Sequence, residues 1–458
     1  MTTSETTSRG SQSFHRTLGL FPATAVNMSQ MCGIGPFITI PLIVAAMGGP
    51  QAVVGWVAGA VLAIADGLVW AELGAALPGA GGTYLYLREA FGSRSGKLMP
   101  FLFVWTAMLF IPLVMSTGVV GLVQYLGYFF PGMSWPLQHF LDIVITGLVI
   151  ILLYRRIESI RWITTGLWIV MLASLAMVIF ASFSHFHADY AFTYPKDAWS
   201  GNKLFVGLGA GLVLAAYDYM GYGTSAYIGD ELRDPGRVIP RSIIYAIVAM
   251  MLLYLALQIG VLGTVPWQTI AHSDSIGSLV VRQNWGVVAA DTATGLILVA
   301  AFASVYTGLL GGSRVPYYAA RDQVFFPVFG RLHKRHGFPH VALLAMGVIT
   351  AAATFFDLGE IINMLVAAAV IVQSLAQIAA LVLLRRDRPN MPRPYRQWLY
   401  PVPCIVAAVG WIYLYWSASG LSQILSGAWI VAGLIAFLVW AKINAAWPFR
   451  AHEPVRDA

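Results

Sequence analysis

Apolar stretches long enough to cross a lipid bilayer recur along almost the whole chain. Hydrophobic residues make up 58% of its 458 residues and charged residues only 10%, whereas a soluble domain carries about 25% charged residues. A helix needs about 20 apolar residues to span the hydrocarbon core. The sequence therefore predicts an all-α integral membrane protein with twelve transmembrane helices rather than a soluble protein. The expected spans are residues 18–47, 52–77, 98–126, 138–154, 162–184, 203–228, 240–262, 287–311, 340–356, 359–384, 400–419 and 423–441.

Two of these spans contain residues that interrupt a helix. The first carries residues 33–37 (GIGPF), and the sixth carries residues 217–223 (YDYMGYG). Unpaired backbone cannot face lipid, so a broken span must line a cavity enclosed by protein. Paired interruptions at matching places in two halves of a chain are typical of transporter binding sites. The pattern predicts a secondary transporter that holds its substrate between the two breaks.

The two breaks differ in chemistry. Glycine and proline around residue 35 would unwind about one turn and present the positive end of the next half-helix, which suits a carboxylate. The alternative is a simple proline kink or close helix packing. At the second break, placing Asp218 at mid-span costs about 2.5–3.5 kcal/mol, so it should face a cavity or a partner. It could contact a substrate ammonium or take up a proton, or instead bond the neighbouring tyrosines and hold the segment together.

The second span carries two more acids, Asp66 and Glu72. Six residues of helix separate them by about 120° around the axis, so they need not share a face. Asp66 is the deeper one. Glu72 lies near the cytoplasmic end, where pairing with cytoplasmic arginines competes with a role in proton coupling. The candidates for proton coupling are Asp66, Glu72 and Asp218.

The distribution of positive charge predicts the topology. The net charge is +7, and 24 of the 27 lysines and arginines fall in segments that share one side of the membrane, which leaves Lys196, Lys203 and Arg282 on the other. Basic residues mark the cytoplasmic side, so both termini are expected in the cytoplasm of a multi-pass cell-membrane protein. The charge therefore reflects topology, and no nucleic-acid partner is expected.

No long linker divides the chain, and one domain is expected. Spans one to five and six to ten would form two structural repeats, which are inverted because each contains an odd number of spans. The expected parts are a cytoplasmic tail (1–17), a ten-helix transport core (18–384), a cytoplasmic connection with two further helices (385–441), and a second cytoplasmic tail (442–458).

Several other classes of protein fit poorly. The two cysteines, Cys32 and Cys404, lie in or at the edge of spans and indicate neither a disulfide framework nor a metal site. The histidines lie outside the spans or at their edges, and HExxH and GxSxG motifs are absent. We therefore expect no enzyme activity, no metal and no cofactor. A channel would be expected to carry a charged ring along its pore, so broken helices favour a carrier.

Short motifs are spread between residues 33 and 327. Besides the first-span run at residues 33–37, they are Glu72-Leu73, Pro78, Gly81-Gly82, Tyr84, Tyr86 and Phe91-Gly92, then Glu231, Pro235, Pro240 and Arg241, and finally Ser313-Arg314, Ala320-Arg321-Asp322 and Pro327. Together these motifs resemble those of the amino acid–polyamine–organocation (APC) transporter superfamily, whose first-span motif is Gly-x-Gly-x-Phe. The resemblance implies a LeuT-like 5+5 inverted repeat with helices 1 and 6 broken, working by alternating access.

The resemblance also implies how the substrate is held. Backbone amides of the first break would bind its carboxylate, although Pro36 has no N–H to offer. Carbonyl groups at both breaks would bind its amine, and Tyr217 takes the place of a gating aromatic. The substrate-binding residues implied in this way are Met31, Cys32, Gly33, Ile34, Gly35, Tyr217, Asp218, Met220 and Gly221.

Departures from the superfamily pattern bear on the driving ion. Some members carry a span-five lysine that substitutes for sodium, but this chain has no lysine in its spans and reads TTGLW at residues 164–168. Ser304 and Thr307 would supply some oxygens for sodium, which we regard as the less favoured arrangement. The expected function is sodium-independent transport of a small amino acid, by proton symport, exchange or uniport.

A polyamine or other organic amine is the alternative substrate, with Asp66 and Asp218 as ammonium partners. Asp66 and residues 154–162 resemble the polyamine branch, but residues 107–109 (AML) lack its span-three aspartate and Gly223 replaces its span-six acid. The expected partners are a small-molecule substrate and the bilayer. A disulfide-linked ancillary subunit is not expected, because the outward loop at residues 129–136 has no cysteine.

Overall fold

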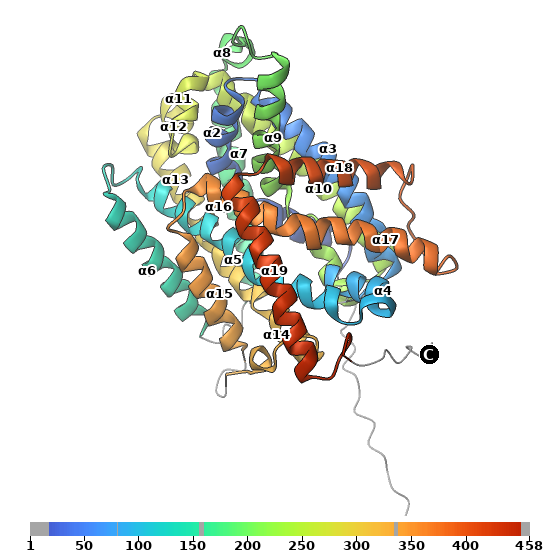
Figure 1. Cartoon of the computed structure of the whole chain (residues 1–458). Coiled ribbons are helices and arrows are strands. Elements are labelled where there is room, and N and C mark those ends of the chain that lie inside the picture. The colour runs from blue at the N-terminus through green and yellow to red at the C-terminus, as the bar shows by residue number, and fades with distance from the viewer. Residues whose placement is uncertain (1–17, 80, 155–159, 334–337, 450–458) are drawn as a thin grey trace, which may run out of the picture.

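The computed structural model describes residues 18–79, 81–154, 160–333 and 338–449, and it is helical apart from one isolated bridge between Leu18 and Leu232 (Figure 1). The expected tail at residues 1–17 and the last part of the second tail, residues 450–458, lie outside the described residues. The α-helices are α1 (Leu20–Met31), α2 (Gly35–Met47), α3 (Ala52–Ala76), α4 (Thr83–Ser95), α5 (Leu98–Leu126), α6 (Trp135–Leu153), α7 (Ile160–Ser184), α8 (Ala188–Phe192), α9 (Gly201–Tyr219), α10 (Pro235–Thr264), α11 (Trp267–Ala271), α12 (Ile276–Trp285), α13 (Val287–Gly312), α14 (Arg314–Arg321), α15 (His340–Ala353), α16 (Leu358–Ala369), α17 (Ala376–Asp387), α18 (Val402–Ser417) and α19 (Gly420–Ile443).

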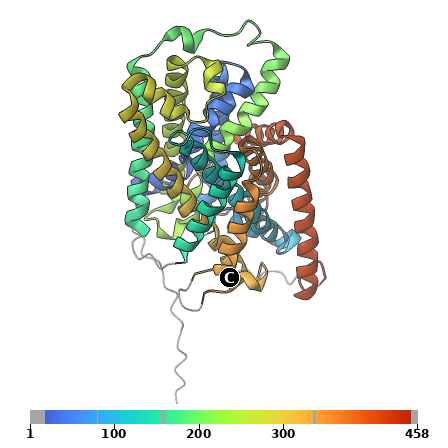
Figure 2. The same ribbon diagram turned by 90° about the vertical axis from the view of Figure 1, so that its left-hand side faces the viewer.

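Seven helical segments of the described chain are long and apolar enough to cross a membrane, and the bent pair α1 and α2 makes an eighth if counted as one span. The protein is therefore a multi-pass membrane protein. One segment is formed by α16, the π-helical turn Val370–Leu375 and α17. Of its most apolar stretch, 72% is buried in the protein, so this segment is central. By contrast, only 22% and 28% of the most apolar stretches of α6 and α19 are buried, so these two helices lie at the periphery. Figure 2 shows α19 along one outer edge.

The helical hydrogen-bond ladder stops between α1 and α2. Helix α1 ends at Met31, α2 begins at Gly35, and the two are bent by 49°. Cys32 takes an extended conformation, and Pro36 at the start of α2 has no N–H to continue the ladder. This interruption coincides with the residues in the sequence that disfavour a continuous helix.

A second stretch of irregular backbone, here called the second interruption, follows the end of α9. Met220 is extended, Gly221 has a φ of +112°, and two short 3-10 turns, η1 (Thr224–Tyr227) and η2 (Gly229–Glu231), lead to α10. A positive φ favours glycine. A Cβ on Gly221 would lie 2.8 Å from the carbonyl carbon of Gln30, so the backbones of the two interrupted segments nearly touch. Only a residue without a side chain fits between them.

Packing partners explain why the two interruptions meet. Helix α2 packs against α9, and α1 packs against α10. Helix α3 contacts both α9 and α10 through small residues: a Cβ on Gly59 would lie 2.9 Å from the Cβ of Ala215, and one on Gly74 would lie 2.7 Å from Ile239. Small residues let membrane helices approach closely. Segments nearly 190 residues apart in sequence are thereby held side by side.

Candidate functional site

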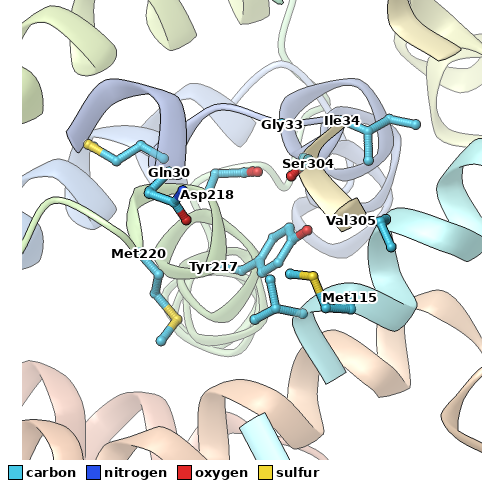
Figure 3. A pocket seen from close by; sticks show the side chains of 13 residues that line it. Gln30, Gly33, Ile34, Met115, Tyr217, Asp218, Met220, Ser304 and Val305 are labelled. Atoms are coloured by element: carbon cyan, nitrogen blue, oxygen red, sulfur yellow. The ribbon is translucent and has the colours of Figure 1, made fainter. Parts of the chain in front are cut away.

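A cavity of about 60 Å³ lies where the two interruptions meet, as Figure 3 shows. Helices α1, α5, α9 and α13 and the segment between α1 and α2 contribute its walls. The lining residues are Gln30, Met31, Gly33, Ile34, Gly35, Val114, Met115, Gly118, Tyr217, Asp218, Met220, Ser304 and Val305. Seven of the nine residues expected to bind substrate are among them, so the structure brings most of the predicted set together.

Two of the expected residues do not line this cavity. Cys32 is buried behind the first interruption, with 1% of its surface exposed. Gly221 packs against the backbone of Gln30 and brings the two interrupted segments together. Their place in the structure is beside the cavity, not on its wall.

The first interruption presents unpaired donors. In the part of the chain that the structure describes, the N–H groups of Gly33, Ile34 and Gly35 have no hydrogen-bond acceptor, and the N–H of Phe37 donates to the carbonyl of Ile34 at 3.0 Å. These N–H groups lie at the positive end of the α2 dipole. Such a terminus is suited to a carboxylate or another small anion. Carboxylate binding by this segment stays a prediction.

Asp218 is 1% exposed and lies against the first turn of α2. One carboxylate oxygen, Oδ2, accepts a hydrogen bond from the hydroxyl of Thr39 at 2.5 Å. The other, Oδ1, has no hydrogen-bond partner among the described residues, and it lies so close to Gly35 that a side chain there would clash with it. The neighbouring tyrosines do not bond this carboxylate: Tyr217 bonds Thr117 at 2.7 Å and Tyr222 bonds Asp66. One acceptor of a buried acid thus remains available.

Tyr254 of α10 connects the two interruptions and did not figure among the expected site residues. Its hydroxyl lies 2.7 Å from the carbonyl oxygen of Met31 and 3.2 Å from that of Asp218. The ring is fully buried against Trp56 and Tyr219. The two carbonyls that it bridges belong to the set expected to hold the substrate amine. The sequence did not single it out, because Tyr245 and Gln258 are further polar residues of the same span.

A second buried polar cluster ties α1 to the segment after α9. The N–H of Ser225 donates to Asn27 Oδ1 at 2.7 Å, Asn27 Nδ2 donates to Ser225 Oγ at 3.1 Å, and Ser242 Oγ donates to Ser225 Oγ at 3.0 Å. All three side chains are 0% exposed. The cluster fixes the position of α1 relative to α10, and sequence reasoning missed it because its members are far apart in the chain.

The other two proton-coupling candidates lie away from the cavity. Asp66 is buried and accepts hydrogen bonds from Tyr222 at 2.5 Å and from the indole of Trp411 at 3.2 Å. It thereby joins α3 to the residues after α9 and to α18. Its contacts make it a link between elements, whereas Asp218 alone of the three candidates lines the cavity.

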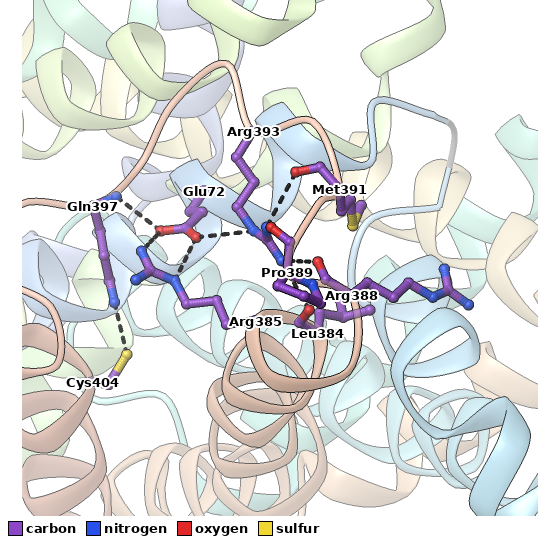
Figure 4. Close-up of polar contacts among 9 residues, drawn as sticks. All are labelled: Glu72, Leu384, Arg385, Arg388, Pro389, Met391, Arg393, Gln397 and Cys404. Carbon is purple, nitrogen blue, oxygen red and sulfur yellow. Dashed lines mark hydrogen bonds and ion pairs between the residues drawn. The ribbon is translucent and has the colours of Figure 1, made fainter.

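Glu72 lies in an ion-pair cluster at the end of α3 (Figure 4). Arg385 forks onto it, with Nε 2.8 Å from Oε1 and Nη2 2.5 Å from Oε2. The N–H of Gln397 donates to Oε2 at 2.9 Å, and Arg393 Nε lies 3.7 Å from Oε1. Glu72 thus pairs with arginines of the segment after α17, which is the kind of pairing that the sequence left open as the alternative to proton coupling. Forked arginine–carboxylate pairs are strong and geometrically specific.

The described residues contain no group of three or more His, Cys, Asp or Glu side chains that could hold a metal ion. Of the two hydroxyls weighed for sodium, Ser304 lines the cavity beside Gly33, and Thr307 donates to the carbonyl of Ala303 in its own helix at 2.9 Å.

An interrupted-helix cavity within a multi-pass membrane protein defines the class of small-molecule carriers. The chain belongs to the amino acid permease family, whose sequence model matches residues 18–444. It is similar to the branched-chain amino acid permease BcaP of Bacillus subtilis, at 23% identity over 94% of each chain. It also resembles two other Bacillus subtilis proteins: the aspartate-proton symporter, at 25% identity over 94% of this chain and 84% of the relative, and the methylthioribose transporter, at 23% identity over 94% of this chain and 95% of the relative.

These comparisons confirm that the chain is an APC superfamily amino acid transporter embedded in the membrane, with a small molecule as substrate. Its relatives are transporters and permeases, which agrees with the expectation of a protein that is not an enzyme.

Proposed function

We propose that this protein moves a small, apolar amino acid across the cytoplasmic membrane by alternating access, without sodium, as a proton symporter or an exchanger. The observation that carries the proposal is the convergence of unpaired N–H groups at Gly33, Ile34 and Gly35 with the carbonyls of Met31 and Asp218 at one cavity. The amides suit a carboxylate and the carbonyls suit an ammonium group. A zwitterion carries both charges at the spacing that one cavity can bridge.

The cavity lining supports a small apolar side chain on the substrate. Ile34, Val114, Met115, Met220 and Val305 provide apolar surface. No lysine or arginine is among the lining residues, so an acidic side chain on the substrate would have no cationic partner there. The relative named for branched-chain amino acids therefore fits this lining better than the one named for aspartate.

The proposed architecture is a LeuT-like 5+5 inverted repeat with twelve spans. Helices α7, α9, α15 and α18, added to the eight candidate spans, give this number. The interrupted spans would be the first (α1 and α2) and the sixth (α9 and the turns after it). Residues 18–384 would form the transport core, and residues 385–441 would add a cytoplasmic connection and two peripheral helices.

The proposed orientation places both termini in the cytoplasm. In Figure 1, α4, α14 and the end of α19 lie toward one edge, whereas α8, α11 and α12 lie toward the opposite edge. The first group carries Arg88, Arg94, Arg314, Arg321 and Lys442, and the second carries only Arg282 on α12. This distribution supports a cytoplasmic assignment for the first edge. Cys32 and Cys404 are buried, which supports function without a disulfide-linked ancillary subunit.

Uptake by proteoliposomes with modified substrates tests the proposal. We expect saturable uptake of leucine or alanine, and we expect leucinol, which lacks the carboxylate, and isocaproate, which lacks the amine, to compete at least tenfold more weakly. A charge-assisted hydrogen bond contributes about 1.5–3 kcal/mol, so removing either group should have an effect of this size. Competition by leucinol as strong as that by leucine would contradict carboxylate binding by the N–H groups of Gly33 to Gly35.

An organic amine remains the second candidate substrate, because one carboxylate oxygen of Asp218 at the cavity has no hydrogen-bond partner in the described part of the chain. Asp66 was expected to hold a second ammonium group, but it already accepts two hydrogen bonds and does not line the cavity. Saturable uptake of putrescine with leucine inert would favour this candidate over the amino acid.

A further inference from the structure

A second cavity, of about 410 Å³, lies at the junction of α17 and the connection to α18, far along the chain from the substrate cavity. Its walls carry four arginines, Arg385, Arg386, Arg393 and Arg396, together with Val382, Pro389 and Tyr400. Four guanidinium groups around one cavity give it an excess of positive charge, which favours the binding of an anion.

Two of these arginines are already committed to the protein. Arg385 forks onto Glu72 and lies 3.8 Å above the ring centre of Tyr400. Arg393 donates to the backbone carbonyls of the connection, including that of Leu384 at 2.9 Å (Figure 4). Together they neutralise Glu72 and hold the wall of the cavity in place.

The other two arginines are exposed and have no ion-pair partner among the residues that the structure describes. The nearby carboxylates are engaged elsewhere: Asp387 pairs with Arg94 at 2.6 Å, and Glu89 pairs with Arg388 at 3.1 Å. Arg386 and Arg396 therefore leave two positive charges available at the mouth of a preformed cavity. Arginine is the residue best suited to phosphate, which it can bind through two parallel hydrogen bonds.

The surroundings of the cavity are apolar and exposed. Trp398 and Leu399, beside Arg396, are 66% and 79% exposed. Helix α18 continues from this point with an exposed stripe at the spacing of one helix face, formed by Val402, Ile405, Val409, Ile412 and Trp416. Exposed tryptophan next to arginine is typical of the boundary between hydrocarbon and headgroups. Because Tyr400 lines the cavity and α18 begins two residues later, this apolar stripe, which is suited to acyl chains, starts next to the cavity.

We propose that this cavity binds the phosphate group of an anionic phospholipid, with Arg386 and Arg396 holding the headgroup and the exposed face of α18 contacting the acyl chains. Basic pockets between membrane helices on the cytoplasmic side bind such headgroups. The shared chemistry is a phosphate anion, and the apolar stripe of α18 favours the lipid over free phosphate as its source. This site is independent of the proposed substrate and of the direction of transport.

Native mass spectrometry of the detergent-purified protein tests the site. Phosphatidylglycerol is titrated against phosphatidylcholine of the same acyl chains, and inorganic phosphate and glycerol 3-phosphate are titrated in parallel. We expect phosphatidylglycerol to bind at least tenfold more tightly than phosphatidylcholine. In the double variant R386Q/R396Q the affinity for phosphatidylglycerol should fall roughly 10- to 30-fold, since each basic side chain near an anionic headgroup contributes about 1 kcal/mol.

The matched control is R233Q/R331Q, which removes the same charge from two exposed arginines that do not line the cavity. This control should keep the preference for phosphatidylglycerol, and thermal unfolding without added lipid should be equal in both double variants, which shows that both are folded. Equal binding of the two lipids to the unaltered protein would overturn the proposal, as would an equal loss in the control. Inorganic phosphate that competes as well as the lipid would overturn the lipid as the source.

Discussion

Asp218 and Glu72 are both buried carboxylates in apolar helices, yet their surroundings differ. Glu72 accepts hydrogen bonds from Arg385 and from the N–H of Gln397, and its charge is neutralised within the protein. Asp218 accepts one side-chain hydrogen bond, from Thr39, and keeps Oδ1 without a partner in the described residues. A satisfied buried carboxylate stabilises a fold, whereas an unsatisfied one at a cavity is available to a substrate or a proton.

Replacing Glu72 should therefore affect stability most. The variant Glu72→Gln leaves Arg385 and Arg393 near an uncharged group, and breaking a buried ion pair destabilises a protein by about 3–5 kcal/mol. We expect a large drop in the midpoint of thermal unfolding in detergent. Arg388→Gln is the control, since it breaks the exposed pair with Glu89 and should change stability by less than about 1 kcal/mol. Equal effects of the two changes would contradict the structural role of Glu72.

Replacing Asp218 should affect transport rather than stability. In Asp218→Asn the hydrogen bond with Thr39 can be kept, so thermal stability should change little, but the charge at the cavity is lost. We expect substrate uptake by proteoliposomes to fall at least tenfold, because hydrogen bonds to charged groups contribute about 1.5–3 kcal/mol. If the carboxylate carries the coupled proton, the pH dependence of uptake should flatten as well. Unchanged affinity and pH dependence would leave Asp218 with neither role.

The variant Thr39→Val tests which of the two carboxylate oxygens of Asp218 matters for transport. The change removes the one side-chain donor to Asp218 while the charge stays. A modest loss of stability with uptake largely retained would show that the free oxygen, not the bonded one, matters for transport.

Removing the hydroxyl of Tyr254 should have a smaller effect. Tyr254→Phe keeps the ring against Trp56 but frees the carbonyls of Met31 and Asp218 from their shared donor. Loss of one neutral hydrogen bond amounts to about 0.5–1.5 kcal/mol. Because the two carbonyls are then held less firmly in the orientation proposed to bind the amine, the KM for the amino acid should rise by at most about two- to tenfold. Tyr245→Phe on the same helix is the control, because that side chain is 53% exposed and should leave KM unchanged. A loss of stability without any change in KM would make Tyr254 a purely structural residue.

The sequence predicted the parts of the site that depend on local backbone chemistry. Glycine and proline at residues 33–36 coincide with the end of α1 and the start of α2, and the cavity is lined by Met31, Tyr217 and other residues of the expected set. The membrane class followed from composition, and the family comparison confirmed the resemblance read from the motifs.

What the sequence could not show depends on contacts between distant segments. Thr39 and Asp218 are 179 residues apart, and the Asn27–Ser225 pair is 198 apart. No local pattern reveals such pairs, because helix packing alone decides which side chains meet. For the same reason the sequence left Glu72 between two roles, since its partner Arg385 lies 313 residues further along the chain.

The smallest effect is expected at the hydroxyls of α13. If transport does not use sodium, replacing sodium by choline should leave the uptake rate of the amino acid unchanged, in the unaltered protein and in Thr307→Ala alike. The hydroxyl of Thr307 donates to Ala303 within its own helix, so its loss should alter stability by less than about 1 kcal/mol. Ser304→Ala, which removes a hydroxyl from the cavity wall, should change KM no more than about twofold, in sodium and choline equally. If uptake requires sodium and these changes abolish that requirement, the two hydroxyls belong to an ion site. The second interruption, with Asp218, would then bind the substrate only.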